Sequence, residues 1–429
     1  MADQDKADSE KRSKGAGSFC IPRTAIQALL DAKADAYTIC AYLTLACYTD
    51  ESGTYSTASA KAIQTATGAN KMTGGPIPRA IQRLKEIHAF KRELVSNGKA
   101  GNKHGWIEHK TDLGPILFDR DTWLQQTGEV VPDGPTARGK ILHILPTFSE
   151  PAVSRVWFGR GLVEGFETHK QPLKQVKNAG DVPARLLLSM YAANDMETWG
   201  GVCPVGHESG PRVHYEPVSV PVVLPNGATL IRAKRGSEIA EIAPNVSGGD
   251  NAAYWQALEV LQSIGLIYEV VLVLNRNAEM RKFPSGDTYS GIPADAEPLY
   301  ELDCRSQHGY KPKGEEGLGG ITALTAGDRG HPVATHGGQF DGTYAAIVRR
   351  GQGAMIAGIY RLRYRVSNLK NAGIKSTWSR IYENNRDHYA FIASLRAAYG
   401  LPVIPAPWEA EASIKAGTEA KEGRKRESL

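Results

Sequence analysis

Two stretches of this chain present the same order of sequence patterns, and that repeated order limits the fold more than any other feature. Each stretch has an apolar run long enough for a buried helix, then a short helix, a third helix that is apolar on one side, and a β-favouring run. The stretches cover residues 21–119 and 183–274. The sequence therefore predicts an α+β fold with two similar modules in tandem.

The first stretch predicts three helices and a hairpin. Residues 37–48 are mostly apolar, residues 57–67 form a short helix, and a third helix begins at Pro76, because the first helical turn tolerates proline. The apolar side of the third helix carries Ile77, Ile81, Leu84 and Ile87. Residues 91–117 follow, with the turn signal Asn97-Gly98 between β-favouring pieces, which predicts the hairpin.

The second stretch predicts the same elements in the same order. Residues 183–193 are a buried helix, residues 237–243 a short helix, and residues 251–264 a third helix that Asp250 is placed to cap. This third helix is expected to bury Trp255, Leu258, Leu261 and Ile264 and to present Asn251, Tyr254, Gln256 and Gln262. Residues 266–274 are a nearly unbroken β-type run, like the first strand of a hairpin.

The second stretch also contains additional residues. Aligning Tyr48 with Tyr191 gives an offset of 143 positions, whereas aligning Leu84 with Leu261 gives 177, so 34 residues are extra in the second stretch. Residues 205–235 supply them and have the composition of a β-excursion. We expect a duplication with a β insertion between the first and second helices of the second copy.

The whole chain can then be divided. The predicted parts are a disordered tail at 1–17, module 1 at 18–120, a connector at 121–177, module 2 with its β insertion at 178–304, a Gly-rich flexible segment at 305–342, a basic C-terminal region at 343–406 and a disordered tail at 407–429.

The basic C-terminal region carries an excess of positive charge. The net charge of the chain is only +5, but between Arg349 and Arg386 nine bases face a single acid, Glu383. Such local asymmetry is typical of a polyanion binder. Aromatic residues among these bases suit stacking on exposed nucleobases and suit a protein core equally well.

The secondary structure of this region is partly ambiguous. Residues 356–369 fit a strand, with Arg361, Arg363 and Arg365 on one face, and fit a helix about as well. Residues 381–399 predict a helix, with Gly400 after it. We therefore expect a basic helical region after the two modules.

Composition and motifs argue against a membrane protein and against a catalytic centre. No apolar run is long enough to span a bilayer, and the polar first seventeen residues lack the apolar run of a signal peptide. Five scattered cysteines without a Cys-x-x-Cys pair indicate a reducing compartment, so we expect a cytoplasmic protein without membrane partners.

The chain also lacks the common catalytic sequence motifs. The chain contains no Gly-x-x-x-x-Gly-Lys-Ser/Thr loop, no His-Glu-x-x-His and no Gly-x-Ser-x-Gly. The sequence predicts no catalytic residue, no cofactor and no metal. An enzyme whose carboxylates meet only in the folded chain stays open as an alternative.

The segment TYSTASAKAIQTATG…RAIQRLKEI resembles the helix-turn-helix core of the winged-helix superfamily. That resemblance implies a third helix in the major groove of duplex DNA and a wing against the backbone or minor groove. Two such modules, a connector and a basic C-terminal region resemble the replication initiators of plasmids and phages. The implied partners are double-stranded DNA, a second copy in a homodimer, and replication or transcription proteins. A transcriptional regulator, a partition-type protein and a protein-binding scaffold are the alternatives.

The resemblance selects candidate DNA contacts by position and chemistry. Arg79 and Arg83 lie four apart on one helix face, and the planar fork of arginine suits guanine or phosphate. The full set is Asn70, Lys71, Thr73, Arg79, Gln82, Arg83, Lys91, Arg92, Lys99 and Lys103 in module 1, Arg232, Lys234, Arg235, Asn251 and Tyr254 in module 2, and Arg361, Arg363 and Arg365 in the basic region. Since the third helix of module 2 offers no charge, it suits a dimer or partner interface about as well as DNA.

Overall fold

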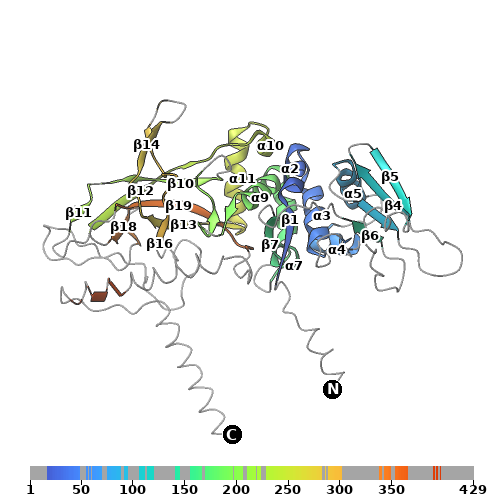
Figure 1. Ribbon diagram of the computed structural model, residues 1–429, viewed down its shortest axis with the longest axis horizontal. Helices are drawn as coiled ribbons and strands as arrows, with labels where there is room; N and C mark the ends of the chain where they lie inside the picture. Colours follow the sequence, from blue (N-terminus) through green and yellow to red (C-terminus); the bar gives the residue numbers. More distant parts are fainter. Residues whose placement is uncertain are drawn as a thin grey trace, which may run out of the picture.

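A computed structural model describes most of the two predicted modules. The described residues are 17–48, 55–56, 58, 60–69, 75–87, 91–94, 106–111, 114–119, 141–144, 155–166, 170–196, 198–205, 210–218, 220–223, 229–282, 286, 288–301, 338–340, 343–348, 353–365, 390–391, 393–394 and 397. They form a mixed α+β fold. Figure 1 shows the helices in the middle of the molecule, with a large sheet on one side and a smaller sheet on the other.

The predicted helices of module 1 are confirmed. They are α3 (Ala36–Cys47), α4 (Ala60–Thr67) and α5 (Pro76–Glu86), and α2 (Arg23–Asp31) precedes them. Helix α3 is buried along nearly its whole length, and Asp35 caps it by accepting a hydrogen bond from the Thr38 backbone N–H at 2.7 Å. Helix α5 packs against α3.

The smaller sheet follows these helices and is antiparallel and five-stranded. Its order is β2 (Tyr55–Ser56), β6 (Ile141–Ile144), β3 (Lys91–Leu94), β4 (Trp106–Thr111) and β5 (Gly114–Asp119). The pairing of β3 with β4 agrees with the predicted hairpin. Strand β6 comes from the predicted connector but lies between β2 and β3, so part of this connector completes the sheet.

Two of the three helices predicted for module 2 are found, and the short one between them lies elsewhere. Helices α9 (Asp181–Ala192) and α11 (Asn251–Ser263) are confirmed, as is the Asp250 cap, which accepts from the Ala253 N–H at 3.0 Å. The short helix predicted at 237–243 is wrong, because residues up to Ile239 continue a strand. The short helix is instead α10 (Pro244–Ser247), with its proline at the first position, where a missing N–H costs nothing.

The large sheet is antiparallel and has eight strands. Its order is β16 (Pro298–Glu301), β13 (Ile267–Leu274), β19 (Met355–Leu362), β10 (Arg212–Pro217), β12 (Thr229–Ile239), β18 (Thr343–Val348) and β17 (Gly338–Phe340), and β11 (Val222–Val223) also pairs with β12. The predicted β-type run at 266–274 is β13. The predicted insertion supplies β10, β11 and β12, so it forms the centre of the sheet.

The ambiguous segment at 356–369 begins as a strand, β19, which ends at Leu362. All eight of its residues are buried, because the sheet is covered on both faces and β19 lies between β13 and β10. Of the two alternatives, the strand is the one found up to Leu362. Of the helix expected at 381–399 the structure describes five residues, which include Ala390 and Phe391, and these five are helical.

The two sheets share one strand order. In each half, the strand between the first and second helices (β2 or β10) pairs with the last strand (β6 or β19). The last strand pairs with the strand that follows the third helix (β3 or β13). That strand pairs in turn with β4, the next strand along the chain, or with β16, which comes after two strands outside this sheet. The similarity predicted for the helices therefore extends to four strands in each half.

The remaining elements join the halves or decorate the large sheet. Strands β1 (Ser18–Pro22) and β7 (Arg155–Gly159) pair antiparallel with each other. Helices α7 (Gly161–Glu164) and α8 (Pro172–Ala179) lead into α9. Two small ribbons, β8 (Asn194–Asp195) with β9 (Gly201–Val202) and β14 (Glu279–Lys282) with β15 (Thr288–Gly291), complete the described strands.

One hydrophobic core runs through both halves. It extends from Phe19 on β1 to Tyr364 after β19 and includes buried residues of α2, α3, α5, α9 and α11. At its centre Phe158 is fully buried and stacks on Phe19 (ring centroids 5.3 Å apart) and on Tyr191 of α9 (4.1 Å). A second cluster, with Trp199, Leu272 and Ile359, covers the other face of the large sheet. Because the first core is continuous, the halves stabilise each other.

We expect Phe158→Ala to lower the free energy of unfolding by about 3–5 kcal/mol, because it removes a fully buried ring from between two others. Denaturant titration followed by tryptophan fluorescence and by circular dichroism measures it. Both signals should still report one coincident transition. Val220→Ala is the control, since Val220 is 83% exposed and should change stability by less than about 0.5 kcal/mol. Two separate transitions in the wild type would contradict the shared core.

Candidate nucleic-acid interface

Helix α5 presents the polar face that the sequence predicts. Ile77 and Leu84 are buried on the inner side, whereas Arg79, Gln82 and Arg83 are exposed on the outer side. The spacing of three and four residues separates the two faces, as expected for a surface helix. The three candidate side chains on this helix are therefore brought together.

The two arginines of α5 differ in their contacts. Arg83 forms an ion pair with Glu86 (Nη1 to Oε2, 3.2 Å) and donates to the Ala32 carbonyl at the end of α2 (3.3 Å). Arg79 has no hydrogen-bond or ion-pair partner within the described part of the chain. Arg83 thus connects α5 to the end of α2, whereas Arg79 and Gln82 are exposed on the same helix face.

Other candidates of module 1 are less well defined. Lys91 and Arg92 lie on β3, with Arg92 opposite Glu108 of β4 and His143 of β6. Asn70, Lys71, Thr73, Lys99 and Lys103 lie outside the described residues.

Helix α11 differs from its predicted pattern at one step. Tyr254 is 3% exposed, and Trp255, expected in the core, is only partly buried; their rings meet edge to face at 5.2 Å. The expected outward placement of Tyr254 is therefore wrong. Helix α11 packs against both α9 and α8, and its buried face is turned toward Tyr254 and Ala257 and away from Trp255.

The exposed face of α11 contains Asn251, Ala252, Gln256, Glu259 and Ser263. It carries amides and one carboxylate but no cation. Asn and Gln side chains can pair with adenine, and a carboxylate can accept from cytosine, but none of them neutralises phosphate. This face differs from that of α5 in charge.

The three bases predicted before the second helix of module 2 lie in the middle of a strand. Arg232, Lys234 and Arg235 belong to β12, where Arg232 is partly buried and Lys234 is exposed. They were expected to flank a helix at 237–243, and that helix is replaced by the end of β12. Their neighbours are consequently those of a sheet.

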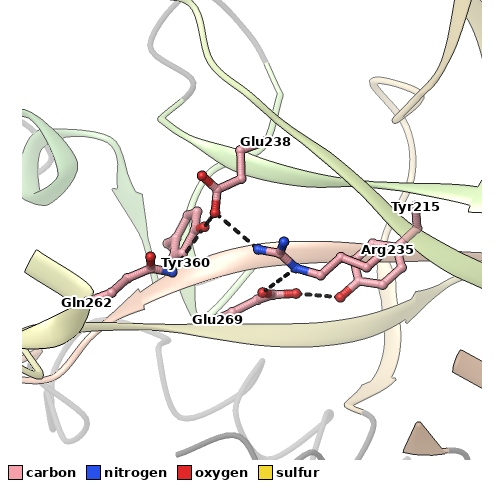
Figure 2. Close-up of polar contacts among 6 residues, drawn as sticks. All are labelled: Tyr215, Arg235, Glu238, Gln262, Glu269 and Tyr360. Atoms are coloured by element: carbon pink, nitrogen blue, oxygen red, sulfur yellow. Dashed lines mark hydrogen bonds and ion pairs between the residues drawn. The ribbon is translucent and has the colours of Figure 1, made fainter. Parts of the chain in front are cut away.

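Arg235 is held in a network of side chains across four strands (Figure 2). Its Nε lies 3.2 Å from Glu269 Oε2 of β13, and its Nη2 lies 3.1 Å from Glu238 Oε1. The hydroxyl of Tyr215 on β10 donates to Glu269, and that of Tyr360 on β19 donates to Glu238. Two carboxylates therefore face one guanidinium.

Burial and charge fix the protonation of this network. Burial opposes the charged guanidinium, but the neighbouring groups Glu269, Tyr360 and Glu238 together outweigh it and raise the pKa of Arg235. Burial, together with the hydrogen bond to Glu238, raises the pKa of Tyr360, so the phenol keeps its proton and donates it. Gln262 of α11 donates to the Tyr360 oxygen at 3.2 Å, which ties the helix to the sheet. Arg235 is engaged in the fold by Glu238 and Glu269, although its side chain is 39% exposed, so the DNA contact expected of it stays a prediction.

A clue to this network was present in the sequence. Glu269 is the single charged residue in the apolar run at 266–274, and a buried carboxylate needs a partner. Nothing in the local sequence indicates that the partner is Arg235, which is 34 positions away.

Gly358 makes room for the network. A Cβ at this position would lie 2.7 Å from Cε2 of Tyr215 and 2.8 Å from Cβ of Val213, closer than real contacts allow. The ring of Tyr215 can therefore cross β19 to reach Glu269 only because residue 358 has no side chain.

The three arginines at the end of β19 and just after it also contact other parts of the fold. Arg361 is 3% exposed and donates Nε–H to the Gly200 carbonyl at 2.8 Å. Arg363 donates to the Gly265 carbonyl (3.3 Å), and Arg365 donates to the Tyr268 hydroxyl (2.5 Å). The alternation of bases and apolar residues here does not mark a solvent face, because β19 is covered on both sides. Arg361 is thus buried and Arg365 partly buried, and only Arg363 of the three is exposed; the DNA contact expected of this set stays a prediction.

Within the described ranges, no group of three or more His, Cys, Asp or Glu residues is placed to hold a metal ion. Among those same residues no helix has the length and apolar character needed to cross a bilayer. Comparison of the chain with family models, with curated proteins and with solved structures gave no match. The site must therefore be interpreted from its own chemistry.

We expect Gly358→Ala to destabilise the protein by about 1–3 kcal/mol, because the methyl group overlaps Tyr215 and Val213. Urea denaturation of Gly358→Ala, Tyr215→Ala and the double variant measures it. If the clash with the ring is the cause, the double variant loses less stability than the two single losses together. Strict additivity would contradict this account.

We expect Cys40 and Cys47 to resist alkylation in the native protein. Burial raises the pKa of each thiol to about 12, so at pH 8 almost no thiolate is present. Pulse labelling with iodoacetamide and peptide mass spectrometry should find both unmodified until denaturant is added. Rapid native labelling of either would show that this part of the core opens.

Proposed function

We propose that this protein is a sequence-specific double-stranded DNA-binding protein of the replication-initiator type, that it acts without catalysis, and that its two modules are winged helices in tandem. One observation carries the proposal. The third helix of module 1, α5, presents Arg79 and Gln82 outward, next to a small antiparallel sheet. A surface helix with donors for base edges is what the major groove admits.

The order of elements supports two winged-helix modules. In each half, a strand after the third helix (β3 or β13) pairs with the last strand, and a strand between the first and second helices (β2 or β10) joins the same sheet, with β11 and β12 as additional strands there in module 2. Each third helix packs on the first helix of its own half, α5 on α3 and α11 on α9, so that one face is anchored and the other is free for a ligand. Duplex DNA fits the α5 face by charge.

The initiator type is proposed over a simple regulator because both modules belong to one packed body. The shared core from Phe19 to Tyr364 keeps two third helices in one chain, which suits a long DNA site. A transcriptional regulator of this build would bind DNA in the same way.

A protein-interaction role for module 2 is the second candidate. The observation in its favour is the exposed face of α11, which includes Glu259 and no cation. A face with one carboxylate and no cation does not attract phosphate, but it is compatible with contact to another protein.

The decisive experiment is selection of duplex fragments from a random pool. Wild type should enrich one motif, and Arg79→Ala should lose the guanine preference at one position, with affinity falling by about 1–3 kcal/mol. Arg276→Ala is the charge-matched control, since Arg276 lies far along the chain and pairs with Asp295 at 2.9 Å. The control should keep the motif, and its affinity should fall only slightly.

Two results would count against the proposal. If wild type enriches no motif and binds duplexes of any sequence weakly, the scaffold role replaces specific recognition. If Arg79→Ala and Arg276→Ala behave alike, α5 does not read bases.

A further inference from the structure

The β insertion of module 2 carries a group of exposed valines. Val218, Val220 and Val223 are 52%, 83% and 68% exposed, and they are three of the five large hydrophobic residues exposed within the described ranges. Their exposed area is on the order of 300 Å², a size at which an apolar patch on a monomer often has a function. We name residues 218–223 the valine segment.

The valine segment has no charge, although the chain as a whole is rich in charged residues. Asp, Glu, Lys and Arg make up 23% of the chain, but none of them occurs between Glu216 and Arg232. A neutral apolar surface offers nothing to phosphate, so a nucleic acid is a poor occupant. Contact with another neutral apolar surface is favourable, because it removes both surfaces from water.

The valine segment stands out from the large sheet because the chain bulges there. Pro217, at the end of β10, pairs with Ala233 of β12. Five residues further along, Val222 of β11 pairs with Leu230, which is only three residues from Ala233. The extra residues form a bulge, and bulges turn side chains away from their regular direction. Val220, the most exposed of the three valines, lies within this bulge.

Addition of a further strand at this edge is disfavoured. The Val218 N–H points toward β12 and donates to the Arg232 carbonyl at 3.0 Å. The preceding position therefore points to the outer edge, and there Pro217 has no N–H to offer. A second proline, Pro221, follows within the bulge. A partner consequently packs on the side chains of the valine segment and does not extend the sheet.

One acid and one base border the valine segment and are not paired with each other. Glu216 lies opposite Lys234 in the register of β10 and β12. Glu216 is 65% exposed, and its Oε1 lies 3.7 Å from Nε2 of His214. Lys234 is exposed and has no hydrogen-bond or ion-pair partner in the described part of the chain. Across a two-fold axis, the acid of each copy can face the base of the other copy.

We propose that this protein forms a reversible, closed homodimer in which the valine segments of two copies pack on each other across a two-fold axis, with Glu216 of each copy facing Lys234 of the other. A second copy matches the segment both in its lack of charge and in the charges that border it. The contact is weak, because a stable interface buries about 800 Å² on each partner and the three valines supply less than half of that area. A two-fold contact uses the same surface on both copies, so it closes at two chains.

This inference is independent of the proposed DNA binding. Figure 1 shows β11 at the end of the large sheet, on the opposite side of the molecule from α5. Strands β11 and β12 are additional to the strand order that the two modules share. The dimer contact therefore leaves the α5 face uncovered.

Sedimentation velocity of the full chain, from low micromolar to several hundred micromolar, tests the dimer. The average mass should rise with concentration from one chain toward two and no further. Val220→Lys should weaken association about ten-fold or more, because it places two like charges close together across the axis. Met280→Lys is the matched control, since Met280 of β14 is 70% exposed but lies outside the valine segment, and it should associate as the wild type does.

Reversal of the bordering charges tests the two-fold arrangement. Glu216→Lys and Lys234→Glu should each weaken association about three-fold or more, since like charges then face each other. The double variant exchanges the two charges and should recover the wild-type association. Arg79→Ala, which bears on DNA binding, should leave association unchanged. Thermal unfolding checks that every variant folds as the wild type does.

Each outcome supports or overturns the proposal. A wild type that stays monomeric at every concentration overturns it and leaves a different molecule as the occupant of the valine segment. Association that Val220→Lys does not weaken places the contact elsewhere, and an average mass that rises beyond two chains shows an open assembly; either result overturns the closed dimer. If both single charge reversals weaken association and the double variant does not recover it, Glu216 and Lys234 do not face each other. None of these results depends on the selection of a DNA motif.

Discussion

The stacking of Phe158 between Phe19 and Tyr191 is the interaction on which the rest of the structure depends. Phe19 belongs to β1 at the start of the first half, Phe158 to β7 at the start of the second, and Tyr191 to the first helix of the second half. The pairing of β1 with β7 brings these rings together, and α3 and α9 pack against them. Because aromatic rings bury much apolar area in one place, this contact turns two small modules into a single core.

Several polar side chains around that core connect one secondary-structure element to another. Arg83, Arg185 and Asn245 all reach the end of α2, from α5, α9 and α10 respectively. The carbonyl end of a helix is the negative end of its dipole, so cationic side chains are favoured there. In the large sheet, Arg235 lies between Glu238 and Glu269 in the same way. Several arginines of this basic protein therefore connect secondary-structure elements, and fewer are left for a polyanion than their number suggests.

Much of the fold could be predicted from local pattern, and the failures have a physical cause. The amphipathic spacing of α5 and the apolar run of α3 and β13 are local signals, and all three elements appear where the sequence predicts them. Strand β19 was ambiguous because apolar residues occupy both faces of a strand that is covered on both sides, so the apolar positions fit the helical spacing as well as the strand spacing. Strand β6 falls in the segment predicted as a connector, since its four residues carry no clear local strand signal and are fixed by pairing with β2 and β3.

The candidate site was predicted less completely for a related reason. The outward positions of Arg79 and Gln82 follow from helical period alone. The roles of Arg83, Arg235 and Arg361 depend on Ala32, Glu269 and Gly200, which are far away in sequence, and no local pattern reveals such partners. Tyr254 and Trp255 exchanged places because the buried face of α11, which packs against both α9 and α8, is turned toward Tyr254.

The position of β19 between β13 and β10 has a consequence for synthesis of the chain. Both neighbours leave the ribosome many residues before β19, and until residue 362 emerges each has one unpaired edge where β19 will pair; the edge of β13 is rich in valine and leucine. Module 1 has the same arrangement on a smaller scale, because β6 follows β2 and β3 in the chain and pairs between them. Unpaired apolar edges invite pairing with other chains. Until β19 has been synthesised, the edge of β13 can therefore pair with other chains, and a product truncated before β19 is expected to aggregate.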